Sequence, residues 1–228
     1  MDLEVPLTQL QVDAAKRLHA GLKQWRTSDG ALRELREKLP GFTETACLTK
    51  TVAVNAIYGT NVMAVVRLAD HVYDTLKLRG DSLAEVEIVE QLAALPPLPG
   101  EKRRRFTSFA AKFCHFFIDD ELFPIYDDAA REALKLHLGW VPKAHDYQSF
   151  CRCFKELHQI AALSCSTREL DRYLWLTGMY MRWKKNPRKA LVNSELRVVL
   201  EHPTPQQRRD LTAMLPPLPN RAIKRRAR

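Results

Sequence analysis

The sequence predicts an all-α protein of about nine or ten helices, and three observations carry this prediction. Apolar residues recur every three or four positions along most of the 228 residues, which is the spacing of an amphipathic helix. No segment shows the two-residue alternation of a half-buried strand. The 13 prolines cluster between apolar segments and glycine is scarce at eight residues, so the breaks between helices are clear and a glycine-rich phosphate loop is not expected.

The first half of the chain is expected to form helices that end at a proline-rich linker near residues 96–99. They span residues 3–22, 31–39, 49–78 with a break near Gly59, and 82–95. Residues 27–30 have the composition of a loop between the first two. Ser82 and Glu85 have the spacing of a capping box, which predicts a helix start.

Five helices are expected in the second half of the chain, over residues 106–117, 127–138, 150–161, 166–183 and 204–215. Asp127 precedes its helix as an N-cap, and Ser166 with Glu169 forms a second capping-box pattern. Thr204 is a cap followed by a proline at the first helical position.

The positive charge is gathered in three blocks. There are 36 Lys and Arg against 27 Asp and Glu, a net charge of +9. Separate basic blocks suit a polyanion better than a small anionic metabolite, although a solvated surface with a basic tail at 216–228 would have the same composition. The blocks consist of Lys102, Arg103, Arg104 and Arg105; of Arg182, Lys184, Lys185, Arg188 and Lys189; and of Arg221, Lys224, Arg225, Arg226 and Arg228.

Several classes of protein and site are excluded. No apolar run approaches the roughly 18 residues needed to span a bilayer, and the N-terminus lacks the regions of a signal peptide, so we expect a soluble, cytoplasmic protein. The five cysteines form no CxxC pair and no disulfide framework. We expect them to be small core residues in a reducing compartment, and we expect no metal and no cofactor.

The most informative pair of residues is Lys112 and Asp127. Lys112 lies in an otherwise apolar helix, where a buried ammonium is costly unless it is paired. Asp127 lies at the start of the next helix, where backbone amides favour a carboxylate. The two could form a charged pair in a cleft between helices, or Asp127 could be only an N-cap and Lys112 could extend to solvent.

This arrangement resembles the helix-hairpin-helix DNA glycosylase superfamily over roughly residues 46–183. Members carry a lysine after the hairpin and then a proline and a short extended turn that lead to the catalytic aspartate, as Lys112, Pro124 and Asp127 do here. The segment 57–61 would match an early helix that lines the DNA-facing cleft, and 170–175 a late helix near the base pocket. The LPGxG hairpin signature is missing, because residues 106–110 occupy its place, and the interval from Lys112 to Asp127 is short.

The resemblance implies a single unit with two helical lobes flanking a DNA-binding cleft. One lobe would span 49–98, and the other would combine 1–48 with 106–215. The substrate would be a modified base, such as the glucosylated hydroxymethylcytosine of a phage, because the chain looks like glycosylases that defend bacteria against phages. The partner would be double-stranded DNA, bound by a monomer.

Breaking a base–sugar bond develops positive charge on the deoxyribose, which a carboxylate such as Asp127 can stabilise. Lys112 would either support Asp127 or attack the sugar as a neutral amine and form a Schiff base. The base pocket is expected to include Tyr126, His115, Tyr173 and Trp175. The DNA contacts are expected to come from Lys102, Arg103, Arg104, Arg105, Tyr58, Asn61, Lys184 and Lys185.

Two other classes of function fit parts of the sequence. Arg131 and His137 have the spacing of the short motif in all-helical HEPN ribonucleases, in which arginine and histidine from a dimer attack RNA. A histidine on such a helix is more often a partly buried polar residue. The charge and the helices fit a non-enzymatic DNA-binding or adaptor protein equally well, so only the pair of Lys112 and Asp127 favours catalysis.

Overall fold

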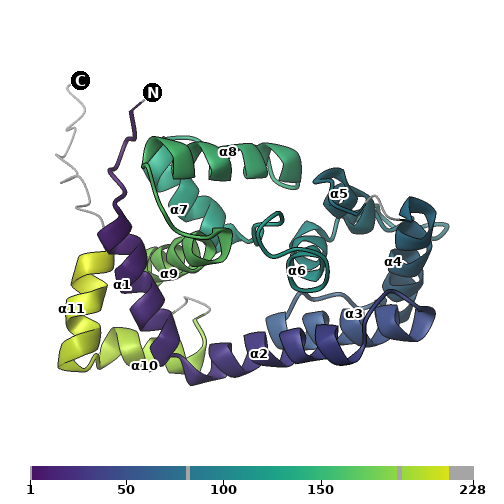
Figure 1. The fold of residues 1–228 in the computed structure, drawn as a ribbon, viewed down its shortest axis with the longest axis horizontal. Helices are drawn as coiled ribbons and strands as arrows, with labels where there is room; N and C mark the ends of the chain where they lie inside the picture. The colour runs from purple at the N-terminus through teal and green to yellow at the C-terminus, as the bar shows by residue number, and fades with distance from the viewer. Residues whose placement is uncertain (1, 81–82, 189–191, 216–228) are drawn as a thin grey trace.

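The computed structural model describes residues 2–80, 83–188 and 192–215, and these form eleven α-helices and no strand (Figure 1). The all-α class is therefore confirmed, with slightly more helices than the nine or ten expected. None of the described helices is long and apolar enough to cross a membrane.

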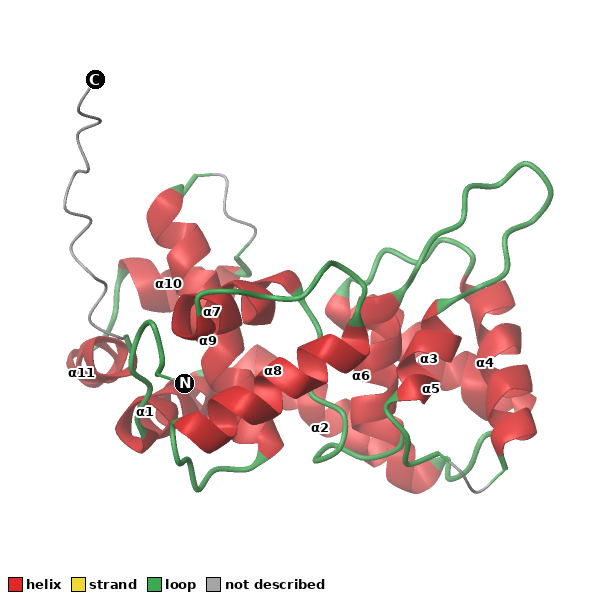
Figure 2. Ribbon diagram, turned by 90° about the horizontal axis from the view of Figure 1, so that it is seen from above, coloured by secondary structure: helices red, strands yellow, loops and turns green. Residues whose placement is uncertain are grey.

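The helices form two groups that α2 (Lys23–Lys38) joins along one side of the molecule (Figure 1). Figure 2 shows α1, α10 and α11 at one end and α3, α4 and α6 at the other. The first group contains α1 (Gln9–Gly21), α7 (Asp128–Leu138), α8 (Tyr147–Ile160), α9 (Thr167–Lys185), α10 (Ser194–Glu201) and α11 (Pro205–Met214). The second contains α3 (Glu44–Tyr58), α4 (Val65–Arg79), α5 (Glu87–Ala93) and α6 (Thr107–Phe117).

The boundary between these groups differs from the lobes expected from sequence. Helix α6 packs against α2, α3 and α5, so it lies with the second group rather than with α7 to α11. Its apolar face explains this placement, because Phe109 and Phe113 are almost completely buried and Phe113 packs against Phe42, which precedes α3. The cleft that the two groups form therefore has α6 on one side and α7 with α9 on the other.

Helix α2 runs without interruption through residues 27–30, so the loop expected there is wrong. Tertiary contacts override the local preference for a turn. Leu32 is completely buried, and the carboxylate of Asp29 is held by partners on α3 and α9. A helix can accept Gly30 at a cost of about 1 kcal/mol, which such contacts offset.

Side-chain caps set the start of several other helices. Thr8 and Gln11 form a capping box, so α1 begins after residues 3–7 rather than within them. The side chain of Asp127 caps α7, and the Ser166 and Thr204 caps lie where the sequence predicted them. Helix α10 was not expected; Asn193 caps it and Leu196, Val199 and Leu200 are its buried residues. Ser82, Lys189 and the basic tail lie outside the described residues. Residues 83–86 are described and are not helical, and α5 begins at Glu87, so the helix start expected from Ser82 and Glu85 is wrong.

Helices α7 and α9 approach each other closely at Gly178. A Cβ atom added to Gly178 would lie 2.0 Å from the carbonyl oxygen of Ala129, which is far inside van der Waals contact. Only glycine fits there, because the obstacle is backbone and cannot rotate away. The contact fixes the start of α7, and therefore Asp127, against the middle of α9. All five cysteines are buried and free, as expected for core residues.

Candidate functional site

A cavity of about 590 Å³ lies between the two groups of helices. Its wall is formed by α2, the end of α3, one face of α6, the start of α7 and one face of α9, and it includes both Lys112 and Asp127. The volume lies in the range of roughly 300–1,000 Å³ that is usual for ligand pockets. The aromatic side chains on its wall are Trp25, Tyr58, Phe106, Phe109, Phe116, Tyr126 and Trp175.

Lys112 is buried in the cavity wall, with 4% of the residue exposed, and does not extend to the outer surface. Its Nζ donates a hydrogen bond to Ser108 Oγ at 2.7 Å, one turn earlier on α6. Nζ also lies 5.6 Å from the centre of the Tyr58 ring. Burial lowers the pKa of Lys112 below its ordinary value, while the charges of Asp127 and Asp171 act in the opposite direction. The lysine is therefore easier to deprotonate than one in water.

Asp127 is both the N-cap of α7 and part of the cavity wall. Its Oδ1 accepts a hydrogen bond from the backbone N–H of Ala130 at 2.8 Å, which fixes the rotamer of the side chain. A helix N-terminus is a favourable place for a carboxylate. The N-cap interpretation of Asp127 is confirmed, and the cap positions the carboxylate at the cavity, while the charged pair with Lys112 stays a prediction.

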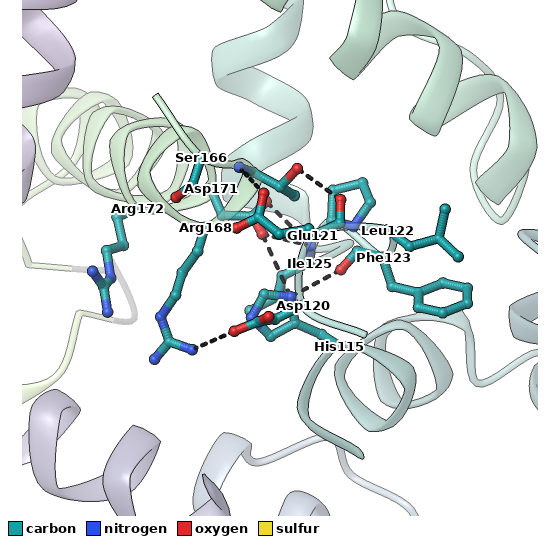
Figure 3. A network of polar contacts seen from close by, with 12 residues as sticks. His115, Asp120, Glu121, Leu122, Phe123, Ile125, Ser166, Arg168, Asp171 and Arg172 are labelled. Atoms are coloured by element: carbon teal, nitrogen blue, oxygen red, sulfur yellow. Dashed lines mark hydrogen bonds and ion pairs between the residues drawn. The ribbon is translucent and has the colours of Figure 1, made fainter. Parts of the chain in front are cut away.

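Asp171, on α9, is a buried carboxyl group in the same cavity that the sequence did not single out. Its two oxygens accept from the backbone N–H of Ile125 at 3.1 and 3.0 Å (Figure 3). Burial raises the pKa of Asp171 well above its usual range, which favours the neutral acid. The hydrogen bonds between Ile125 and Asp171 hold the extended segment that precedes Asp127. The sequence signal that could have identified Asp171 is that it is an acidic residue on the apolar face of a helix.

His115 is almost completely buried, and its Nδ1 lies 2.9 Å from the carbonyl oxygen of Phe123 (Figure 3). A carbonyl only accepts, so Nδ1 carries the hydrogen and donates it. Burial lowers the pKa of His115 to about 4, so the ring is neutral at pH 7. Its Nε2 is buried with no hydrogen-bond partner among the described residues, and His115 belongs to the cavity wall.

A second polar cluster ties α2, α3 and α9 together at another part of the cavity. The hydroxyl of Tyr58 donates to Asp29 Oδ1 at 2.7 Å, and Arg168 donates to Asp29 Oδ2 at 2.5 Å. Arg172 lies 3.6 Å from the same oxygen. Arg168 also lies 3.5 Å from Asp120, and Figure 3 shows it extending from α9 towards that residue. Sequence reasoning missed this cluster, and it placed Tyr58 against DNA.

The remaining predicted base-pocket residues divide into two sets. Tyr126 and Trp175 belong to the cavity wall. Tyr173 does not: it is completely buried, and its hydroxyl is hydrogen-bonded to His137 Nε2 at 2.9 Å. The reason is helical periodicity, because Asp171, Arg172 and Trp175 face the cavity while Tyr173 points to α7. The prediction for Tyr173 is therefore wrong.

The predicted DNA-binding residues lie around the cavity rather than together. Arg105 belongs to the wall, and Lys102, Arg103 and Arg104 are exposed in the extended segment before α6. Asn61 is exposed in the loop between α3 and α4 and is not part of the wall. The exposed Lys184 and Lys185 end α9, one turn beyond Arg182.

The two residues of the ribonuclease-type motif do not form a site. His137 is completely buried, with Nδ1 2.8 Å from the carbonyl oxygen of Val5 and Nε2 bonded to Tyr173. Arg131 donates to the carbonyl oxygen of Pro142 and lies over the Tyr126 ring. His137 is thus a core histidine with both nitrogens satisfied, which contradicts a catalytic role for it.

The fold and the cavity define an all-α protein with a polar and aromatic pocket between two groups of helices. A family model, HI_0787_N, described as an N-terminal domain, matches residues 10–121, just under half of the chain. The match extends from α1 past the end of α6, so it includes Lys112 but ends before Asp127. No curated protein and no solved structure matches the chain. Among the described residues, no group of three or more side chains is arranged to hold a metal ion.

Proposed function

We propose that the protein is a DNA glycosylase that hydrolyses the bond between a modified base and its deoxyribose. The observation that carries the proposal is the cavity itself. Lys112 and Asp127 come from different helices, and both belong to the wall of one aromatic-lined pocket. A base inside a duplex is out of reach of such a pocket, so the target nucleotide must turn out of the stack to enter it.

The bound base would lie among Tyr58, Phe116 and Trp175, with its deoxyribose at Asp127 at the start of α7. As the bond between C1′ and the base breaks, the electron pair leaves with the base and positive charge develops on the sugar. The Asp127 carboxylate stabilises that charge and orients a water molecule onto C1′. The water supplies the new hydroxyl group, its proton passes to solvent or to the departing base, and an abasic site remains.

Two chemical roles for Lys112 fit this reaction. As an ammonium group it is attracted to the charge of Asp127 in the same cavity wall and supports that carboxylate electrostatically. As a neutral amine it attacks C1′ itself while the electron pair of the broken bond leaves with the base. The sugar ring then opens at the C1′–O4′ bond to give a Schiff base, and loss of a proton from C2′ with departure of the 3′ phosphate cuts the strand. Its lowered pKa makes the second role accessible. Borohydride, which reduces a Schiff base to a stable bond, distinguishes the two because it would link the wild-type protein to DNA only in the second case.

The duplex would be bound by the first basic block, since Arg105 lies in the cavity wall and Lys102, Arg103 and Arg104 are exposed beside it. DNA binding should therefore weaken as the salt concentration rises, and the dependence should be steeper the more phosphates these side chains neutralise. The resemblance to anti-phage glycosylases favours a hypermodified phage cytosine, such as glucosylated hydroxymethylcytosine, as the substrate. We also propose that the protein acts as a monomer in the cytoplasm.

The test is incubation of the protein with modified phage DNA and with unmodified DNA, followed by assays for free base and for alkali-labile sites. Asp127→Asn should lower base release by at least about 100-fold, which is typical of losing one transition-state contact. Asparagine is as good an N-cap as aspartate, so the fold should be retained. The matched control is Asp146→Asn, because Asp146 caps α8 in the same way and is outside the cavity wall. DNA binding without base release from any substrate would favour the non-enzymatic interpretation.

A further inference from the structure

The cavity wall contains two carboxyl groups whose surroundings differ. Asp127 caps α7 and accepts a hydrogen bond from the backbone there, and a helix N-terminus favours the charged carboxylate. Asp171 comes from α9, belongs to the same wall and is only 5% exposed. Enzymes that need one acid and one charged carboxylate in a single site obtain them by placing the two groups in such contrasting surroundings.

Asp171 has no cation against it that would hold it in the charged form. Among the described residues it forms no ion pair with a lysine or an arginine, and the hydrogen bonds that it accepts come from one backbone N–H, that of Ile125. His115 Nδ1 lies 3.9 Å from Asp171 Oδ2, but it donates to Phe123 and the ring is neutral. A buried carboxylate without a countercharge is costly, so the protonated form of Asp171 is favoured.

The position of Asp171 on α9 places it beside the proposed base site. Trp175 follows it by four residues, about one turn, and both belong to the cavity wall. Trp175 is one of the side chains among which the base would lie. Ile125, which donates to Asp171, is two residues before Asp127. One carboxyl group is therefore beside the base site, and a short segment connects it to the carboxylate at the sugar site.

We propose that Asp171 is the acid that protonates the base as the base leaves. The proposal rests on the proposed function and makes Asp171 a second catalytic residue. The electron pair of the bond to C1′ passes to the base, and the proton of Asp171 neutralises that charge at a ring nitrogen or a carbonyl oxygen. Water adds to C1′ beside Asp127 and releases its proton to solvent, from which Asp171 regains a proton.

This assignment narrows the class of substrate. A base that is neutral in DNA leaves as an anion unless it receives a proton, so an acid in the pocket accelerates its release. An alkylated purine that already carries a positive charge leaves as a neutral molecule and gains little from such an acid. The site is therefore suited to neutral modified bases.

The test compares base release by the wild-type protein and by Asp171→Asn between about pH 5.5 and about pH 8. Asparagine keeps an oxygen that accepts from the N–H of Ile125, but it has no acidic proton. At the upper end of this range the variant should be slower by about 100-fold or more. As the pH falls, protons from solvent replace that of Asp171, so the ratio of the wild-type rate to the variant rate should shrink.

The matched control is Asp210→Asn. Asp210 is also a buried carboxyl group, but it lies on α11 and is not part of the cavity wall. This variant should keep both the rate of the wild-type protein and its pH profile.

The ratio of the two rates isolates Asp171 from the other groups that titrate, because those groups are the same in both proteins. Lys112 and Arg168 act against the raised pKa of Asp171, and the charge of Asp127 adds to it. The groups that lie close enough to interact with Asp171 are Lys112 and His115 on α6, Asp127 at the start of α7, Tyr147 and Cys151 on α8, and Arg168 on α9.

The outcomes separate this inference from the proposed function. If the wild-type protein releases no base from any DNA, the proposed function fails and the role of Asp171 fails with it. If the wild-type protein is active but Asp171→Asn is as fast, or is slower by a factor that does not change with pH, only the acid is overturned. A constant factor would mean that Asp171 does no more than hold Ile125.

Circular dichroism checks that Asp171→Asn is folded. If it is not, an infrared titration of the wild-type protein decides, since a protonated carboxyl group has its own carbonyl band. We expect this band at pH 7, and its absence would overturn the proposal.

Discussion

Replacing Gly178 with alanine is predicted to destabilise the protein and to damage the site, although alanine is the better helix former. In an unobstructed helix this change gains about 0.5–1 kcal/mol. Here the new Cβ would lie 2.0 Å from the carbonyl oxygen of Ala129, and ordinary contact begins at 3.4 Å, so α7 and α9 must separate by more than 1 Å. Overpacking of this kind costs about 1–3 kcal/mol. The free energy of unfolding should fall, despite the gain in helix propensity.

The displaced element is the start of α7, which carries Asp127. The rate of base release should therefore fall even under conditions in which the variant is fully folded. A misplacement of about 1 Å can cost on the order of 100-fold in rate. The assays are urea unfolding followed by circular dichroism, and base release under conditions in which the variant is fully folded. The control is Gly30→Ala, since a Cβ at Gly30 in α2 meets nothing within 4 Å and should stabilise. If Gly178→Ala stabilises as Gly30→Ala does and keeps its activity, the close approach of α7 and α9 does not position the site.

Two further predictions concern the buried polar groups. Burial holds the pKa of both His19 and His115 at about 4 against 6.5 in the unfolded chain, so the unfolded state binds more protons between these values. The free energy of unfolding should therefore fall as the pH drops from 6.5 to 4, by up to about 3 kcal/mol for each histidine, and His19→Gln should flatten the profile in urea titrations by about one proton. Asp29→Asn leaves Arg168 and Arg172 facing a neutral amide, and should lower the free energy of unfolding by about 2–4 kcal/mol in the same assay; an unchanged midpoint would contradict a structural role for the cluster.

Local patterns in the sequence were sufficient for the fold class and for the starts of α7, α9 and α11, whereas α1, α2, α3 and α5 begin five or more residues from the expected positions. The caps at Asp127, Ser166 and Thr204 depend on a few neighbouring residues, and each was found where expected. The same local reasoning failed at residues 27–30, because distant contacts to Asp29 and Leu32 decide the conformation there. Helix α10 has only eight residues, which is short for a periodicity to be seen.

The candidate site was predictable only in part. Lys112 and Asp127 could be found because each is unusual in its own helix. Asp29 and Arg168 could not, because the two partners lie 139 residues apart. Asp171 is also unusual in its own helix, but its partner Ile125 lies 46 residues away, so its role could not be predicted. Tyr173 was wrongly assigned to the base pocket. The sequence does not distinguish an aromatic residue on the cavity face of a helix from one at the neighbouring position, which points elsewhere.

The central claim is that the carboxylate of Asp127 acts on a sugar whose base occupies the cavity. The most direct measurement is a crystal structure of the Asp127→Asn variant bound to duplex DNA that carries a substrate base. We expect the base to lie among Tyr58, Phe116 and Trp175, with C1′ of its deoxyribose about 3–4 Å from the side chain of residue 127. DNA bound on another face, with the cavity empty and residue 127 far from any sugar, would contradict the account.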